Sequence, residues 1–411
     1  MAKINRILSQ TVRQDFQDID AVFINGGRQT GKSTFVENFG RQYKKVFYLS
    51  LDDITVRAAE LTSPGSIFEN IDSGLIILDE VQLIPGSFWA IKAKIDRVRR
   101  QRRAVKFLLT GSADIALFPQ LAEALVGRMY TRTMYPFSAA EVFKTPGTLV
   151  EKLFRKSLQP LQILPKQNIS SVIEKATFPR LALQVKDKTA WCQNYISTLV
   201  ERDIKNLADI DRIETLPGLL SILANRVGGL LNDSDLANAA KLSLMTLRRY
   251  RALFENVFLV SLLPPWHKKI EKRFVKSPKI YFNDTRLLCH LLGVRPDNAL
   301  RQRQDLYGFI LENFILSELK KQLPGGHTLY HFRTQDQKEI DFIIEKTGGD
   351  LVALEVKAAS TVSPEDFKHI RFLQKALPER FVCGAVIYQG HKILQIDKNL
   401  YALPIESLWQ L

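Results

Sequence analysis

Short apolar runs alternate with helical stretches through the first part of the chain. The runs read AVFING, KVFYLSL, LIILDE and KFLLTGS, and segments with helical spacing separate them. Strands that are apolar throughout and joined by helices are typical of a parallel sheet covered on both faces. We therefore predict an α/β fold with a parallel sheet over residues 1–142.

The pattern changes after residue 142 and predicts three further regions. Residues 143–215 carry few strand signals and end in a long helical pattern. Residues 216–295 have helical periods, followed by the strand-like runs VFLVSLL and KIYFND. Residues 296–411 open with a helix over Tyr307–Gln322 and continue with the strands FIIE, LVALEVK and FVCGAVIYQ. We expect a helical linker, a helical domain ending in two strands, and a second α/β domain.

Composition narrows the environment and the partners. The formal net charge is +15, which favours polyanions such as nucleic acid, although a generally basic surface gives the same number. The densest basic segment is DRVRRQRR, which ends at Arg103 and is a candidate for phosphate contact. No apolar stretch reaches the roughly 18 residues of a membrane span, and the N-terminus lacks a secretory core. The 3 scattered cysteines indicate a reducing cytoplasm.

The segment GGRQTGKST carries the clearest chemistry. It follows a strand, precedes a helix and matches G-x-x-x-x-G-K-[ST] from Gly26 to Ser33. In this motif, main-chain N–H groups and a helix N-terminus surround phosphate oxygens. Lys32 reaches the β- and γ-phosphates, and the Ser33 hydroxyl binds Mg²⁺. The motif predicts ATP and Mg²⁺ as cofactors, bound by Gly26, Gly27, Arg28, Gln29, Thr30, Gly31, Lys32, Ser33 and Thr34.

Two later strands of the predicted sheet end in polar residues. GLIILDE ends in Asp79 and Glu80, at the edge where ligands bind in open α/β sheets. We expect Asp79 to hold Mg²⁺, and Glu80 to orient or deprotonate the attacking water. KFLLTGS ends near Ser112, whose hydroxyl could contact the γ-phosphate or simply close a turn.

Arg128, in LVGRMY, is a candidate for stabilising charge on the transferred phosphoryl group, in cis or from a neighbouring subunit. A purely structural arginine is the alternative. Together with Lys32, Glu80 and Ser112, it completes the predicted catalytic set.

The segments GGRQTGKST, YLSLDD, LDEVQ, LLTGS, GRMY and YPFSAAEV, in this order, resemble the AAA-type ATPases that carry a C-terminal DUF4143 domain. The resemblance covers nearly the whole chain. It implies a P-loop ATPase core, then a winged-helix region and then a nuclease-like fold. It assigns Lys32, Ser33, Asp79 and Glu80 to the nucleotide, places Ser112 at a polar sensor position, and identifies Arg128 as the arginine after the glycine of a short GR motif.

The segment NDSDLANAAKLSLMTLRRYRALFENVFLV resembles a helix-turn-helix followed by the start of a wing. Its second helix carries Arg248, Arg249 and Arg251, which could enter a major groove or contact phosphates. A winged helix used only for packing between domains is the alternative.

The last region carries acidic residues in the order of the PD-(D/E)xK nuclease pattern. Glu312 lies on a helix, Asp341 on a strand, and Glu355 and Lys357 on one face of the next strand. Asp341 and Glu355 could bind Mg²⁺, and Lys357 could position water. An inactive nuclease-like fold with a salt-bridged strand edge is the alternative.

These features predict a cytoplasmic ATPase that couples nucleotide hydrolysis to nucleic-acid binding or processing, with DNA favoured over RNA and no membrane association. A DNA-cleaving nuclease regulated by ATP and a nucleotide-dependent switch with a protein partner are the alternatives. A homo-oligomer stays open.

Overall fold

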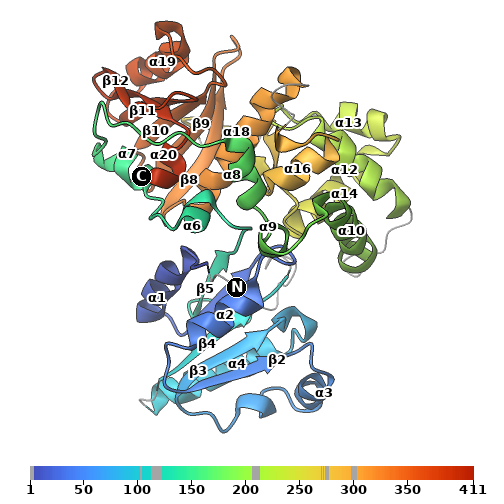
Figure 1. Ribbon diagram of the computed structural model, residues 1–411. Coiled ribbons are helices and arrows are strands. Elements are labelled where there is room, and N and C mark those ends of the chain that lie inside the picture. The colour runs from blue at the N-terminus through green and yellow to red at the C-terminus, as the bar shows by residue number, and fades with distance from the viewer. Residues whose placement is uncertain are drawn as a thin grey trace. The chain divides into compact units, whose positions relative to one another are not determined.

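The computed structural model describes residues 4–101, 104–112, 123–205, 213–269, 271, 273, 277–297 and 303–411. The chain forms two compact units, Met1–Pro136 with Asn256–Leu259, and Phe137–Glu255 with Val260–Leu411 (Figure 1). The finer division into four domains stays a prediction.

A five-stranded parallel sheet is the centre of the first unit, in the order β2-β3-β4-β1-β5. Its strands are β1 (Ala21–Asn25), β2 (Val46–Ser50), β3 (Gly74–Asp79), β4 (Val105–Thr110) and β5 (Met129–Thr133). The predicted α/β fold with a parallel sheet is confirmed. The sequence patterns predicted four of these strands and missed β5, which is short, polar and only partly buried.

Alternating side chains of β1 pack on opposite faces of this sheet, as period-two geometry requires. Val22 and Ile24 face helices on one side, and Ala21 and Phe23 face the other. The helices and 3₁₀ turns of the unit are α1 (Leu8–Asp18), α2 (Lys32–Gly40), α3 (Ile54–Thr62), η1 (Ser66–Phe68), η2 (Val81–Leu83) and α4 (Ser87–Arg100). Helices α1 and α2 cover the Val22 face, and α4 covers the Phe23 face. The edge strand β2 remains largely exposed, in contrast to the predicted full cover.

The second unit begins with a helical layer. Its helical elements, in chain order, are α6 (Ala139–Phe143), α7 (Leu149–Arg155), α8 (Ile169–Lys175), α9 (Pro179–Leu183), α10 (Lys188–Thr198), η4 (Leu199–Ile204), η5 (Ile213–Thr215), α12 (Leu216–Ala224), α13 (Asp233–Ala240) and α14 (Leu244–Asn256). The predicted helix pair is α13 and α14, and Lys241 between them adopts the left-handed conformation that ends α13. A two-stranded antiparallel pair follows, β6 (Val260–Leu263) with β7 (Lys279–Phe282).

A six-stranded mixed sheet forms the rest of the second unit, in the order β12-β13-β11-β10-β9-β8. Its strands are β8 (His327–Arg333), β9 (Glu339–Lys346), β10 (Leu351–Val356), β11 (Phe381–Tyr388), β12 (Leu394–Asp397) and β13 (Leu400–Pro404). The accompanying helical elements are α16 (Thr285–Leu291), α18 (Gln304–Lys321), η6 (Pro364–Phe367), α19 (Lys368–Ala376) and α20 (Ser407–Gln410). Helix α19 packs on one face through Ile370 and Leu373. The Cys383 thiol donates to the Leu153 carbonyl of α7.

Among the described residues, no helix is both long and apolar enough to span a membrane.

Candidate functional site

The phosphate-binding motif lies between the end of β1 and the start of α2, as the sequence predicts. Gly26 has φ 144°, and a Cβ at this position would lie 2.2 Å from the Met134 carbonyl oxygen. Gly31 caps α2 with φ 93°, a left-handed conformation that glycine adopts without strain. The backbone therefore requires glycine at both ends of the loop.

The Lys32 side chain is buried and folded across the loop. Its Nζ donates to the carbonyl oxygens of Gly26 at 2.9 Å and Gly27 at 3.0 Å. The Thr30 hydroxyl closes the same turn by donating to Gly27 O at 2.9 Å. Arg6 adds a bond from outside the motif, from its guanidinium to Thr30 O at 2.9 Å. A buried ammonium that donates to carbonyl dipoles is well placed to exchange them for phosphate oxygens.

Asp79 ends β3 and is buried between two hydroxyl groups. Tyr48 on β2 donates to Asp79 Oδ2 at 2.6 Å, and Thr110 at the end of β4 donates to Asp79 Oδ1. Burial and this bond to Asp79 raise the pKa of the Tyr48 hydroxyl. The two hydroxyls fix the carboxylate at the carboxyl edge of the sheet, where the sequence places it.

Glu80 follows in the left-handed conformation, with φ 57°. Its backbone N–H donates to Thr110 Oγ1 at 3.1 Å. Gln82 Nε2 donates to Glu80 Oε2 at 2.5 Å and to Ser112 Oγ at 3.1 Å. Gln82 thus links two residues that the sequence predicted separately, Glu80 and Ser112.

Arg128 is engaged by α4 of the same unit. Its Nε lies 2.8 Å from Asp96 Oδ1, and its Nη2 lies 3.1 Å from Asp96 Oδ2. This bidentate bond lowers the pKa of the Asp96 carboxyl. The geometry favours the structural alternative for Arg128 within one chain, and a role at the phosphoryl group stays a prediction.

In the second unit, the structure brings the predicted C-terminal residues together. Asp341 Oδ2 accepts the backbone N–H of Val356 at 2.8 Å, so β9 places Asp341 beside the E-x-K strand. Lys357 Nζ donates to Glu355 Oε1 at 3.2 Å, which shows that these side chains share a face.

One lysine from β7 completes this carboxylate cluster. Lys279 Nζ lies 2.7 Å from Glu339 Oε1, 3.1 Å from Glu312 Oε1 and 3.6 Å from Asp341 Oδ1. The sequence patterns predicted no specific role for Lys279, whose side chain is 3% exposed. No group of three or more His, Cys, Asp or Glu side chains in the described part of the chain has the arrangement of a metal site.

Burial dominates the electrostatics of the cluster. It raises the pKa of Glu312 to about 7 and that of Glu355 to about 8, with repulsion from Asp341 as the next cause in both. Burial also raises the pKa of Asp341. For Lys279, burial opposes the charged form, but the carboxylates of Glu312 and Asp341 outweigh it and raise its pKa. The lysine is therefore the fixed positive charge of the cluster.

The arginines of α14 differ in their surroundings. Arg251 is mostly buried and bonds to Asp233 on α13, with Glu255 at 3.4 Å. Arg248 is 60% exposed and bonds to the same Asp233 at 2.8 Å. Arg249 is exposed. Arg248 and Arg249 are the members of the set that an external partner can reach, while Arg251 ties α14 to α13.

Family models match three consecutive parts of the chain. An AAA domain matches residues 18–143, a domain of unknown function (DUF8612) matches 167–298, and a second one (DUF4143) matches 307–408. The chain carries an N-terminal AAA domain and a C-terminal DUF4143 domain. The AAA match contains the P-loop, Asp79 and Glu80. The order of the two domains confirms the predicted resemblance.

The chain resembles three bacterial proteins that are described as uncharacterized. Those of Mycobacterium tuberculosis and Mycobacterium bovis are each 28% identical over 398 residues, covering 97% of this chain and 82% of theirs. One of Haemophilus influenzae is 25% identical over 379 residues, covering 87% of this chain and 88% of its own.

Solved structures also share similarity with the chain. A Walker-type ATPase of Pyrococcus abyssi is 11% identical with TM-score 0.41, covering 69% of this chain and 94% of its own. DnaA of Aquifex aeolicus, bound to AMPPCP, is 17% identical with TM-score 0.32, covering 62% and 89%. ORC1 of Aeropyrum pernix, in complex with DNA, is 13% identical with TM-score 0.28, covering 72% and 91%.

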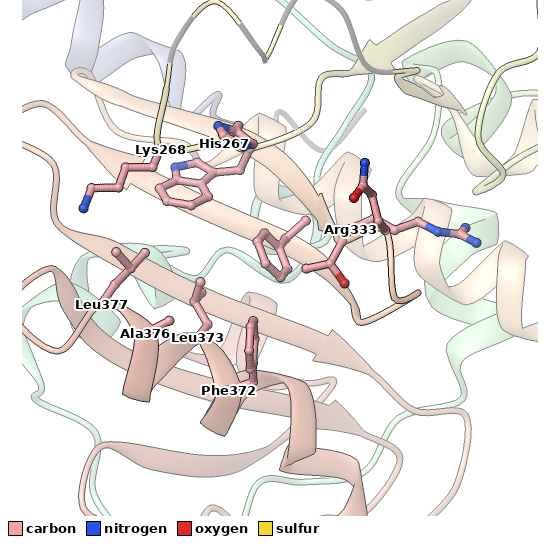
Figure 2. A pocket seen from close by; sticks show the side chains of 11 residues that line it. His267, Lys268, Arg333, Phe372, Leu373, Ala376 and Leu377 are labelled. Carbon is pink, nitrogen blue, oxygen red and sulfur yellow. The ribbon is translucent and has the colours of Figure 1, made fainter.

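The DUF4143 domain contributes to a pocket of about 460 Å³ on the α19 side of its sheet (Figure 2). Phe372 and Leu373 of α19 and Leu377, which directly follows this helix, lie on one side, and His267 and Lys268 lie on the segment opposite. Trp266 and Phe332 add aromatic surface. The pocket is apolar with cations at its rim, and no sequence motif predicts it.

Within the AAA domain, part of the expected basic cluster is occupied internally. Arg97 lies 3.4 Å from Glu69 Oε1, and Arg99 bonds to Asp20. Arg102 and Arg103 lie outside the described residues. The described pairs reduce the charge that this segment can offer to phosphates.

Tyr48, Gln82 and Lys279 are the site residues that sequence reasoning missed. Tyr48 is separated from Asp79 by 31 positions, and Lys279 from Glu312 by 33. Tyr48 reaches Asp79 because β2 pairs with β3, and Lys279 reaches Glu312 because β7 packs against α18. The sequence offered one weak signal for this contact: Tyr48 places a hydroxyl group in β2, the strand next to β3, which ends in Asp79.

Proposed function

We propose that this protein binds ATP with Mg²⁺ in its AAA domain and hydrolyses it. The observation that carries the proposal is the glycine-bounded loop that holds Lys32 against two carbonyl oxygens beside the N-terminus of α2. The buried Asp79, which ends β3 at the same edge of the parallel sheet, supports it.

The residues present fit the magnesium complex of a nucleoside triphosphate. Lys32 supplies the charge for the β- and γ-phosphates, and the loop N–H groups bind phosphate oxygens. The Ser33 hydroxyl and the Asp79 carboxylate would hold Mg²⁺, which neutralises developing negative charge. Tyr48 and Thr110 keep Asp79 oriented.

Glu80 is the candidate for orienting the attacking water and accepting its proton. Gln82 holds its carboxylate, and Thr110 anchors its backbone, so the side chain has a defined direction. Ser112 accepts a hydrogen bond from the same glutamine, so Gln82 connects Glu80 to the segment that follows β4. This arrangement supports hydrolysis in addition to binding.

Replacing the lysine tests the site directly. We expect Lys32→Ala to lower ATP turnover by about 10²–10³-fold, the range for removing one preorganised charge-stabilising group. The matched control is Lys44→Ala, which removes an exposed lysine just beyond α2. Steady-state phosphate release from both variants and the native chain is the measurement. Turnover that survives in Lys32→Ala would remove the assignment.

A nucleic-acid partner is the extension that the surface of α14 supports. Arg248 and Arg249 are exposed on the second helix of a helix pair, and the chain as a whole is basic. A winged-helix role for α13, α14 and the β6–β7 pair is part of this proposal. The competing function is a switch that uses the nucleotide to bind a protein, for which turnover is unaffected by DNA.

A further inference from the structure

The carboxylate cluster of the second unit differs from a metal site in one respect, the lysine at its centre. Three carboxylates surround the Lys279 ammonium within 3.6 Å. An ammonium group has three N–H donors and no acceptor, so these acids match its bonding capacity. Lys279 also lies in the DUF8612 match, outside the DUF4143 match that contains Glu312, Asp341 and Glu355.

The position of Lys279 is fixed by its backbone. Strand β7 pairs with β6, where Leu263 lies opposite Lys279. Asn313 on α18 accepts the Phe282 N–H at 2.8 Å and donates to Phe282 O at 3.1 Å. Tyr281, two residues after Lys279, donates its hydroxyl to Glu312 Oε1 at 2.5 Å. The backbone of β7 is therefore held on both sides, and burial of the Lys279 side chain, which is 3% exposed, keeps the ammonium inside the cluster.

Two of these acids, Asp341 and Glu312, also have other partners. Asp341 uses one oxygen for the Val356 N–H and turns the other toward Lys279. Glu312 accepts from both Tyr281 and Lys279 on the same oxygen. Mg²⁺ needs several oxygen ligands at about 2.1 Å in near-octahedral geometry, and an adjacent ammonium repels it. The Asp341 and Glu312 oxygens that face Lys279 therefore do not fit a divalent cation while the ammonium lies beside them.

We propose that the Lys279 ammonium takes the place of a divalent cation in this cluster, so that the nuclease-like fold is held together by an internal charge and does not cleave DNA. The lysine joins the β6–β7 pair to the acidic strand β9 and helix α18. The acids that resemble a catalytic set then have a structural role. This inference is independent of ATP turnover in the AAA domain.

The test compares Mn²⁺ binding by the native full chain with that of variants at Asp341 and Lys279, in nucleotide-free buffer. We expect the native protein and its Asp341→Asn variant to bind Mn²⁺ equally, as measured by electron paramagnetic resonance, because the native cluster holds no Mn²⁺. Lys279→Met removes the ammonium at similar length, and we expect it to gain a bound Mn²⁺ and a higher melting temperature when Mn²⁺ is added. Adding Asp341→Asn to Lys279→Met should abolish both gains.

Each arm can overturn the proposal. Mn²⁺ binding or plasmid cleavage by the native chain that depends on Asp341 would show that the cluster is a metal site. A folded Lys279→Met protein that gains no Mn²⁺ would show that the lysine does not stand in a metal position. If Lys279→Met does not fold, the native chain and its Asp341→Asn variant still decide, because their comparison needs no change at Lys279.

Discussion

Gly26 is the residue where β1 turns into the phosphate-binding loop, and it has no room for a side chain. At φ 144°, a Cβ would meet the Met134 carbonyl oxygen at 2.2 Å. Since Met134 directly follows β5, relief of this clash would have to move the sheet edge or the loop. Either movement displaces the loop N–H groups that we propose to bind phosphate.

We therefore expect Gly26→Ala to cost about 1–3 kcal/mol of stability from backbone strain and to weaken nucleotide binding. Gly86→Ala is the matched control, because φ is −61° there and a Cβ meets nothing within 4 Å. Chemical denaturation and nucleotide titration measure the two effects. Equal behaviour of the two variants would contradict the strain argument.

The raised pKa of Glu355 leads to a second prediction at the scale of one side chain, on how stability depends on pH. Burial raises its folded-state pKa from 4.5 to about 8. Between pH 4.5 and about 8, the Glu355 carboxyl therefore keeps its proton in the folded protein and has lost it in the unfolded chain. The corresponding stability is present below pH 4.5 and is lost as pH rises toward 8.

Glu355→Gln removes this titration while it keeps the shape of the side chain. We expect the variant to match the native melting temperature near about pH 5 and to exceed it by several degrees near about pH 8.5. The control is Glu365→Gln, since the side chain of Glu365 is 75% exposed. A native protein that stays more stable than Glu355→Gln at the higher pH would refute the sign.

At the scale of elements, helix α14 presents one face to its neighbour and another outward. Arg251 is held by Asp233 and Glu255, whereas Arg248 and Arg249 remain exposed. Replacing the exposed pair with alanine should weaken binding to duplex DNA and reduce the slope of log affinity against log salt by about 1–2. Fluorescence anisotropy over a salt series measures both quantities.

The control for this pair is Lys375→Ala with Lys398→Ala, two exposed lysines in the DUF4143 domain. It removes the same charge from a different surface of the second unit. If both double variants lose affinity equally, the effect comes from net charge, and α14 has no specific part in DNA binding.

How far sequence predicts each element depends on the range of the contacts that define it. The P-loop and its flanking strand and helix are local, and the E-x-K register follows from period-two geometry, so both were predicted. Strand β5 is polar and gains its place only by pairing with β1. Lys279 gains its chemistry only where β7 meets α18. Such positions depend on packing between distant segments, which periodicity does not report.

At the scale of the whole molecule, the family matches and the compact units divide the chain differently. The AAA match ends at residue 143, whereas the first unit ends at Pro136 and takes in Asn256–Leu259. A Cβ on Gly27 would lie 3.6 Å from the Phe258 Cβ, so this short segment packs against the phosphate-binding loop. The family boundary therefore leaves out a part of the first unit.

The segment Asn256–Leu259 has a practical consequence for dissection of the protein. Truncation after Pro136 would deliver a polypeptide from which one wall of the loop at Gly27 has been deleted. An inactive truncation product would then report the missing wall and say little about the catalytic competence of the sheet. Point substitutions in the intact polypeptide avoid this ambiguity.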